Sequence, residues 1–319
     1  MQRAVVSSVT GAGRHLQSPI RSYIIARLLA EGSFGRIFLG ECDGLHVAIK
    51  ETKEPITVAL MDFAHEVVAL RSLTHRALPQ MLDSFIVDNY GYIVIEYING
   101  MSLSAYVDAI GNDLPESTLL DLIEPVVDAL NVMQHWMPPI LHYDIKPDNI
   151  QIDAAGQAYL IDFGSIGVGG AQRALTRSIY SPLEQLDGRV VDQRGQLYSL
   201  GATLYAVLTG SLPPSARQRD PCGSDIALLL TARRPDISTR LAAIIVRLMH
   251  PDLVYRYQGV SELQRDMTLL RTGTPALAIR PQNTQLVWLE VSLAMGAAIL
   301  CLVLVALALV IWFTNRGLC

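Results

Sequence analysis

An eight-residue polar stretch, His142 to Asn149, constrains the fold of this chain more than any other feature. It follows an apolar run with helical spacing and precedes an alternating segment, so it is predicted to form a loop. Asp144, Lys146 and Asn149 supply a carboxylate, an ammonium and an amide. Phosphoryl transfer needs such groups as a proton acceptor, a phosphoryl contact and a metal ligand. With His142, these residues form the pattern H-x-D-x-K-x-x-N. Its four fixed residues recur by chance in about 0.2% of chains this long, so a merely polar loop is the weaker interpretation.

Strand character dominates the chain ahead of this loop. Apolar and β-branched residues predict three antiparallel strands, near residues 22–30, 35–41 and 45–51. Gly32 and Gly35 fall between the first two strands, where glycine lets a backbone lie close to phosphates. The A-x-G-x-x-G pattern is a weak signal, because Ala30 stands where a first glycine would be. A Rossmann turn should open a helix and a P-loop needs Gly-Lys before Ser or Thr, and neither feature occurs here.

Lys50 and Glu66 form a candidate ion pair. The chain has only three lysines against 22 arginines, so a retained lysine is a better candidate for a specific role. Lys50 ends an apolar strand, where lysine is most often an edge charge. Glu66 lies in a predicted helix over 57–73, either as a surface charge or as the partner of a buried cation. The glycine-rich turn nearby favours the functional interpretation of both residues.

The chain changes character near residue 100. Two more strands are predicted within 81–98, and Glu96 to Gly100 then interrupts the pattern. Helices are predicted near 102–110 and 116–135. A small β-rich lobe therefore leads into a helical lobe.

A second candidate metal ligand follows the polar loop. Short strands are predicted at 150–152 and 159–161, and Asp162 comes directly after them. Across this hairpin the Asp162 carboxylate can return beside the Asn149 amide. Mg²⁺ is usually held by one or two protein oxygens together with substrate phosphates. The sequence therefore predicts a magnesium site.

Together these segments resemble the eukaryotic-like protein kinases in their bacterial serine/threonine form, from about Tyr23 to Leu270. The resemblance implies an α+β, bilobal protein-kinase fold. An antiparallel-sheet N-lobe with one main helix would occupy residues 22–98, and a mostly helical C-lobe would occupy residues 99–272. It also implies ATP and Mg²⁺ as cofactors, and protein substrates as acceptors.

The resemblance assigns roles to individual residues. Asp144 matches the catalytic base and Lys146 the γ-phosphate contact, an arrangement that favours Ser/Thr over Tyr acceptors. Asn149 and Asp162 match the magnesium ligands. The residues that match the family's ATP-binding positions are Ala30, Gly32, Ser33, Gly35, Ile37, Ala48, Lys50, Glu66, Glu96 and Ile98. Glu184 is expected to form a structural pair with Arg256, which favours a protein kinase over a small-molecule kinase of the same fold.

Three residues depart from the family pattern. Tyr143 replaces the arginine that normally grips a phosphate on the activation loop. Gln196 stands where an aspartate usually braces the catalytic loop, and it is expected to accept a hydrogen bond still. Arg177 replaces a threonine seven residues before Glu184, so the substrate-docking contacts near Asp144 are expected to differ from the family pattern. None of the three removes a group that performs chemistry, so an active kinase with altered regulation is expected.

An uncharged apolar run covers residues 291–313. At 1.5 Å per residue its 23 residues extend about 35 Å, enough to span a hydrocarbon core. Trp288 and Trp312 lie near its ends, as interfacial aromatics do. A buried core helix is the weaker alternative at this length. The expected organisation is a flexible lead-in over 1–21, the kinase domain, a juxtamembrane linker over 273–286, a transmembrane helix over 287–313 and a short tail over 314–319.

The composition limits the remaining choices. The net charge is −5 without a basic stripe, so nucleic acid is not an expected partner. The four cysteines show no pair spacing, which fits a reducing compartment. The leading hypothesis is a single-pass membrane-anchored Ser/Thr protein kinase with a cytoplasmic catalytic domain, close to membrane-associated substrates. The alternative is a membrane-tethered pseudokinase that acts as a nucleotide-responsive scaffold. Substrate identity and self-association stay open.

Overall fold

The computed structural model describes residues 13–32, 35–111, 113–168, 178–220 and 224–273. The chain divides into two units, Met1–Thr268 and Leu269–Cys319. Both lobes and the candidate site belong to the first unit. In the described ranges no helix is long and apolar enough to cross a membrane. The predicted transmembrane helix over 287–313, with its linker from residue 274 and its tail, lies outside the described residues.

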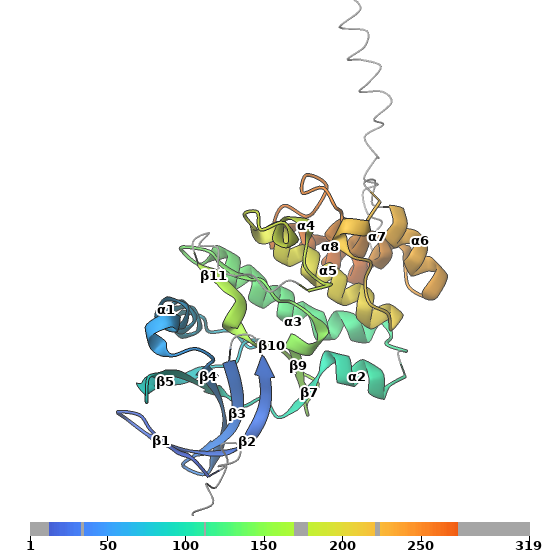
Figure 1. The fold of residues 1–319 in the computed structure, drawn as a ribbon. Coiled ribbons are helices and arrows are strands. Elements are labelled where there is room, and N and C mark those ends of the chain that lie inside the picture. The colour runs from blue at the N-terminus through green and yellow to red at the C-terminus, as the bar shows by residue number, and fades with distance from the viewer. Residues whose placement is uncertain (1–12, 33–34, 112, 169–177, 221–223, 274–319) are drawn as a thin grey trace, which may run out of the picture. The chain divides into compact units, whose positions relative to one another are not determined.

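Six antiparallel strands form the sheet of the N-lobe, in the order β1-β2-β3-β4-β6-β5, and the sheet curls strongly (Figure 1). They span His15–Gln17 (β1), Ser22–Gly32 (β2), Gly35–Cys42 (β3), Leu45–Thr52 (β4), Met81–Val87 (β5) and Tyr90–Glu96 (β6). Helix α1, Ile56–Ser72, contacts β5 and β6. The predicted strands and the one main helix of this lobe are confirmed.

Strand β1 corrects the predicted flexible lead-in over residues 1–21. Leu16 is buried and pairs with Tyr23 of β2, between exposed His15 and Gln17. Leu16 adds apolar area to the buried core of the N-lobe, which stabilises the extra strand. The lead-in prediction is therefore wrong for His15–Gln17.

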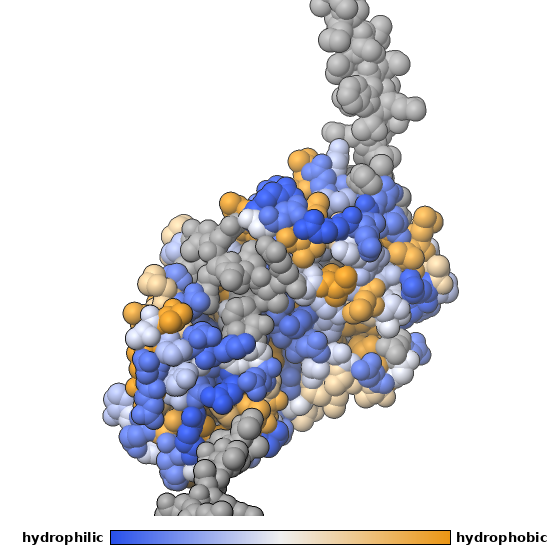
Figure 2. Space-filling view, in the orientation of Figure 1, coloured by the Kyte–Doolittle hydropathy of each residue, from blue (hydrophilic) through white to orange (hydrophobic). Residues whose placement is uncertain are grey.

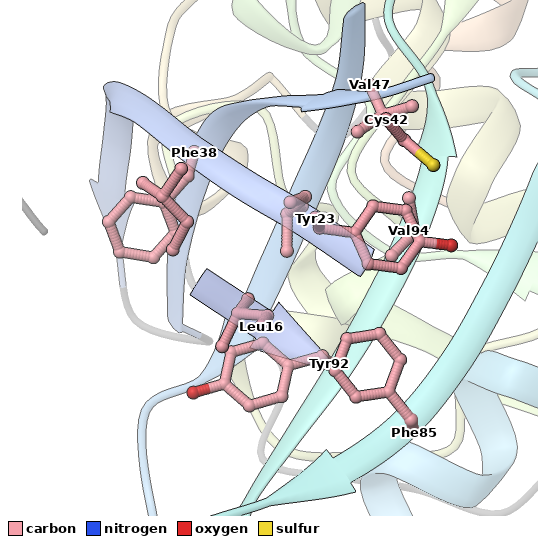
Figure 3. Close-up of a cluster of buried hydrophobic side chains, with 10 residues drawn as sticks. Leu16, Tyr23, Phe38, Cys42, Val47, Phe85, Tyr92 and Val94 are labelled. Atoms are coloured by element: carbon pink, nitrogen blue, oxygen red, sulfur yellow. The ribbon is translucent and has the colours of Figure 1, made fainter. Parts of the chain in front are cut away.

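One face of the curled sheet holds the core of the N-lobe (Figure 3). Successive strand residues point to opposite faces, and on β4 this places Val47 and Ile49 in the cluster and Lys50 on the other face. The aromatic members Tyr23, Phe85 and Tyr92 stack on one another, with ring centroids 5.7 and 5.3 Å apart. Their packing fixes the relative positions of β2, β5 and β6.

Helices build the C-lobe (Figure 1). They span Leu103–Ala109 (α2), Glu116–His135 (α3), Leu183–Leu186 (α4), Gln193–Thr209 (α5), Ser224–Arg233 (α6), Thr239–Leu248 (α7) and Val260–Thr272 (α8). The predicted helices near 102–110 and 116–135 are confirmed. Helix α3 has Glu116 in its first turn and His135 in its last, the charge order that complements a helix dipole. Helix α5 is buried over nearly its whole length and forms the centre of the lobe.

Short strands carry the polar loop between the lobes. Strand β8 (Ile140–His142) pairs with β11 (Ile166–Val168), and β7 (Gly100–Ser102) pairs with β9 (Ile150–Asp153), which pairs with β10 (Ala158–Leu160). Single 3-10 turns follow at Pro147–Asn149, Phe163–Ser165 and Ala216–Gln218. Figure 2 shows hydrophilic residues over much of the visible face of the molecule, with smaller hydrophobic patches between them.

Candidate active site

Asp144 lies at the centre of the loop that follows β8. Its side chain is 4% exposed. Lys146 Nζ donates to Asp144 Oδ2 over 2.7 Å, and Asn149 Nδ2 donates to the same oxygen over 3.1 Å. Asn149 Nδ2 also donates to the Asp144 carbonyl over 2.8 Å. The loop therefore brings together the three polar residues that the sequence pattern singled out.

The second carboxylate oxygen of Asp144 has a different hydrogen-bond environment. Asp144 Oδ1 is buried and has no hydrogen-bond partner among the described residues. A buried acceptor without a donor costs about 1–3 kcal/mol, so such an atom is usually retained for a function. One oxygen of Asp144 is thus fixed by Lys146 and Asn149, while the other remains able to accept a proton from a hydroxyl group.

Lys50 connects the two lobes. Its Nζ lies 2.6 Å from Glu66 Oε1 on α1 and 3.4 Å from Asp162 Oδ1 after β10. Burial would lower the pKa of Lys50, but the charges of Glu66 and Asp162 outweigh this effect and raise it. Burial would likewise raise the pKa of Asp162, but the charge of Lys50 outweighs this effect and lowers it. Lys50 and Asp162 are therefore both charged near neutral pH.

Asp162 and Asn149 lie on neighbouring segments. The Ile161 amide donates to the Asn149 carbonyl over 2.9 Å. Asp162 has φ 63° and ψ 74°, and its Oδ1 accepts the Gly164 amide at the start of a 3-10 turn. Within the described part of the chain, Asn149 donates through Nδ2 and Asp162 accepts through Oδ1. Asn149 Oδ1 and Asp162 Oδ2 have no hydrogen-bond partner among these residues and can bind a cation.

This pair of oxygens suits Mg²⁺ in the company of phosphates. Mg²⁺ prefers hard oxygen ligands and is usually bound through one or two protein groups plus substrate phosphates and water. Across the described part of the chain, no group of three or more His, Cys, Asp and Glu residues is placed to hold a metal ion. Asn149 and Asp162 would thus hold the ion only together with ligands from the substrate.

A hollow beside Lys50 joins the glycine-rich turn to Asp162. It has an empty volume of about 350 Å³ and is lined by Ala30, Glu31, Gly32, Gly35, Ile37, Lys50 and Asp162. Ser33 lies outside the described residues. Ala48 on β4, Glu96 at the end of β6 and Ile98 after it are not part of this lining. Glu31 was not predicted, because nothing in the glycine pattern distinguishes it from a surface residue.

His142 orients the loop from its buried first position. Its Nδ1 accepts the Asp144 amide over 3.3 Å, and its Nε2 lies 3.2 Å from the Ile161 carbonyl. Burial lowers the pKa of His142. A neutral ring accepts at Nδ1 and donates at Nε2, which matches both contacts. The sequence indicated His142 as part of the polar pattern without assigning it this bracing role.

Uncharged groups brace the loop against the C-lobe. The His142 amide donates to Gln196 Oε1 over 3.2 Å, which confirms that this glutamine accepts a hydrogen bond. Gln185 Nε2 donates to the Tyr143 carbonyl over 2.9 Å. The Tyr143 side chain is buried with Leu141 and Val191. Tyr143 therefore fills an apolar pocket, at the position where the family pattern places an arginine.

The predicted pair of Glu184 and Arg256 is confirmed. Arg256 Nη1 and Nη2 donate to the two Glu184 carboxylate oxygens over 2.6 and 3.2 Å. The Arg256 side chain is fully buried, and the Glu184 side chain is 4% exposed. Arg256 also donates to the His250 and Pro251 carbonyls over 2.6 and 3.1 Å. This pair ties α4 to the segment before α8. Arg177 and Thr176 lie outside the described residues.

Comparison with known proteins gives one family. The family model described as protein kinase domain matches residues 23–265. Serine/threonine-protein kinase PknB of Mycobacterium tuberculosis is 28% identical over 275 residues, which are 79% of this chain and 43% of that protein. Serine/threonine-protein kinase PrkC of Bacillus subtilis is 26% identical over 271 residues, which are 77% of this chain and 40% of that protein. The chain thus covers less than half the length of these relatives.

A solved structure shares the fold. The structure described as PpkA-294 apo form aligns with a TM-score of 0.62 and 22% sequence identity, over 80% of this chain and 98% of that one. An identity this low supports the bilobal fold alone.

Proposed function

Since the chain belongs to the protein kinase family, we propose that it transfers the γ-phosphoryl group of ATP to serine and threonine hydroxyls of protein substrates. The observation that carries this proposal is the Asp144 carboxylate. Lys146 and Asn149 hold its Oδ2, and its Oδ1 is buried with no partner among the described residues. A carboxylate in this state suits acceptance of the proton from an attacking hydroxyl.

The surrounding side chains fit the rest of the reaction. Asp144 would accept the hydroxyl proton as the acceptor oxygen bonds to the γ-phosphorus and the bond to the β-phosphate oxygen breaks. Lys146, 2.7 Å from Asp144, would stabilise charge on the moving phosphoryl group. Lys50, fixed by Glu66 over 2.6 Å, would contact the phosphates that remain on the nucleotide. Asn149 and Asp162 would hold Mg²⁺, which neutralises phosphate charge when bound.

Acceptor chemistry tests this function. The chain is incubated with radiolabelled ATP, Mg²⁺ and a generic protein acceptor, and the labelled acceptor is hydrolysed in acid. Label is expected on phosphoserine and phosphothreonine, with a Lys50→Ala variant as the control that transfers little. Label only on phosphotyrosine would contradict the serine/threonine assignment.

Activity is expected to persist without phosphorylation of the activation segment. Tyr143 offers no positive charge to a loop phosphate, and uncharged contacts from Gln185 and Gln196 already brace the catalytic loop. A chain carrying Thr176→Ala and Ser178→Ala should keep kcat within about threefold of wild type, because Tyr143 stands where the family pattern places the phosphate-binding arginine. Steady-state kinetics measure this. A folded double variant without activity would contradict the prediction.

We also propose that residues 287–313 anchor the kinase domain in a membrane, with that domain on the cytoplasmic side where ATP is available. The support is the uncharged apolar run over 291–313, long enough to span a hydrocarbon core, and Trp288 and Trp312 near its ends. Anchoring would keep the active site near membrane-associated substrates.

Fractionation tests the anchor. The full chain is expected in the membrane fraction and resistant to extraction by high salt or alkaline carbonate, whereas a chain ending at residue 286 should be in the soluble fraction. A full chain with Trp288→Ala serves as the control that stays in the membrane. Equal soluble amounts of full and shortened chain would contradict anchoring.

A further inference from the structure

A buried carboxylate lies behind the nucleotide hollow, on the far face of β4. Glu51 directly follows Lys50, and its side chain is fully buried. Arg14 Nη2 and Arg36 Nη2 each donate to a different Glu51 oxygen, and the Tyr92 hydroxyl donates to Oε2 over 2.5 Å. Burial would raise the pKa of Glu51, but these hydrogen bonds and the two arginine charges lower it. Glu51 is therefore an ionised, fully partnered group.

Because side chains alternate between the two faces of β4, Lys50 and Glu51 point to opposite sides of the sheet. Lys50 faces the site with Glu66 and Asp162, while Glu51 contacts Tyr92 of the aromatic cluster on the opposite face. Figure 3 shows this cluster, with Phe38 and Tyr92 among its members. Adjacent residues of one strand thus connect the active site to the core on the other side of the sheet.

Strand β3, which follows the glycine-rich turn, is held in place by its contacts with Glu51. Arg36 pairs with Glu51 in the register of β3 and β4, and its two neighbours, Gly35 and Ile37, line the nucleotide hollow on the opposite face. Gly35 has φ +145°, and a Cβ there would lie 2.0 Å from the Glu51 carbonyl oxygen. Both the backbone and the side chain of Glu51 therefore determine where this end of the turn lies.

Arg14 reaches the same carboxylate from outside the residues that match the family model, which begin at 23. Its carbonyl accepts the Ile25 amide over 2.9 Å, and the Gly13 amide donates to the Ile25 carbonyl over 2.8 Å. Its guanidinium lies over the rings of Phe38 and Tyr92, 5.8 and 5.6 Å from their centroids. The segment before β1 is thus attached to β2 by its backbone and to β3, β4 and β6 by one side chain.

We propose that Arg14 and Arg36 are positioning residues for the ATP phosphates, acting through Glu51 to hold the start of β3 over the nucleotide hollow. This inference rests on the proposed function, because it assumes that the hollow takes ATP. Arg14 contributes from a segment outside the family match, so nucleotide affinity in this chain depends on residues ahead of the kinase domain proper.

Nucleotide binding without turnover tests the proposal in the full chain. Equilibrium dissociation constants are measured for ATP with Mg²⁺ and for adenosine, by competition with a fluorescent nucleotide. The Arg14→Met variant is expected to weaken ATP binding three- to tenfold and to leave adenosine binding within twofold, because the proposal has the start of β3 act on the phosphates and not on adenosine. Arg14→Lys, which retains a positive charge for Glu51, should restore most of the ATP affinity. Arg21→Met removes an exposed arginine of the same segment and is the matched control.

Thermal unfolding of each variant separates positioning from simple stabilisation. A lower Tm in Arg14→Met with unchanged ATP affinity would overturn the proposal, and so would equal weakening of ATP and adenosine. If Arg14→Met does not fold, Arg36→Met carries the same comparison, because Arg36 donates to the other Glu51 oxygen, and Arg36→Lys is its charge-retaining counterpart. A wild-type chain that binds neither ligand would overturn the proposed function, and the inference with it.

Discussion

Replacing Asp144 with asparagine is expected to lower kcat by about 10²- to 10⁴-fold, the usual contribution of a general base. Asparagine has nearly the same shape, so Lys146 and Asn149 can stay close to it, but its amide cannot accept the hydroxyl proton. The apparent KM for ATP should change by less than threefold, because Asp144 is not part of the lining of the hollow formed by Lys50 and the described residues of the glycine-rich turn. Steady-state kinetics with varied ATP and varied acceptor measure both quantities.

Asp148→Asn is the matched control for this variant. Asp148 lies in the same loop, four residues on, but its side chain is exposed. The same chemical change there should leave kcat within about twofold. Equal rates for wild type and Asp144→Asn would show that transfer does not depend on Asp144 as a base.

Replacing Glu184 with alanine is expected to lower the free energy of unfolding by about 3–5 kcal/mol, the usual effect of removing one partner of a buried ion pair. The change leaves the guanidinium of Arg256 buried beside Tyr198 with carbonyl acceptors but no counter-charge. Folded domains are stable by only about 5–15 kcal/mol, so this loss is large. Urea denaturation followed by circular dichroism measures it.

Asp187→Ala supplies the comparison. Asp187 follows the same short helix α4, and it pairs with Arg189 and Arg217 over 3.3 and 2.7 Å at the surface. Solvent screens exposed pairs, so its removal should cost about 0–1 kcal/mol. A Glu184→Ala variant no less stable than Asp187→Ala would contradict the structural role of the buried pair.

The sequence predicted regular elements best where local signals agree. Helix α3 begins after Pro115 and ends before the Pro138-Pro139 pair, and the predicted range of 116–135 is the observed one. The Asp43-Gly44 pair between β3 and β4 is typical of a two-residue hairpin turn, and both residues adopt positive φ there. In both places the residues that end an element are adjacent to it in sequence.

Strand β1 could not be predicted in the same way. It has three residues and a single buried side chain, Leu16, too few to show an alternating pattern. Its stability comes from pairing with β2 and from packing in the core cluster, which are tertiary effects.

The candidate site likewise combines features that local sequence predicts with features that only tertiary contacts create. The spacing of Asp144, Lys146 and Asn149 indicated a loop in which they meet, and the structure brings them within hydrogen-bond distance. The pairing of Glu184 with Arg256 spans 72 residues and was predicted only through the family resemblance. The contact of Arg14 with Glu51 spans 37 residues and has no counterpart in that resemblance, so only the structure could show it.

We expect this chain to be an active kinase. The most direct measurement uses wild-type chain for which ATP binding has been established, and follows radiolabel from ATP to a protein acceptor with Mg²⁺ and with excess EDTA. We expect transfer with Mg²⁺ and none with EDTA, since Asn149 and Asp162 would hold the ion with the phosphates. Wild-type chain that binds ATP yet transfers no label with Mg²⁺ would contradict it and would describe a nucleotide-binding scaffold instead.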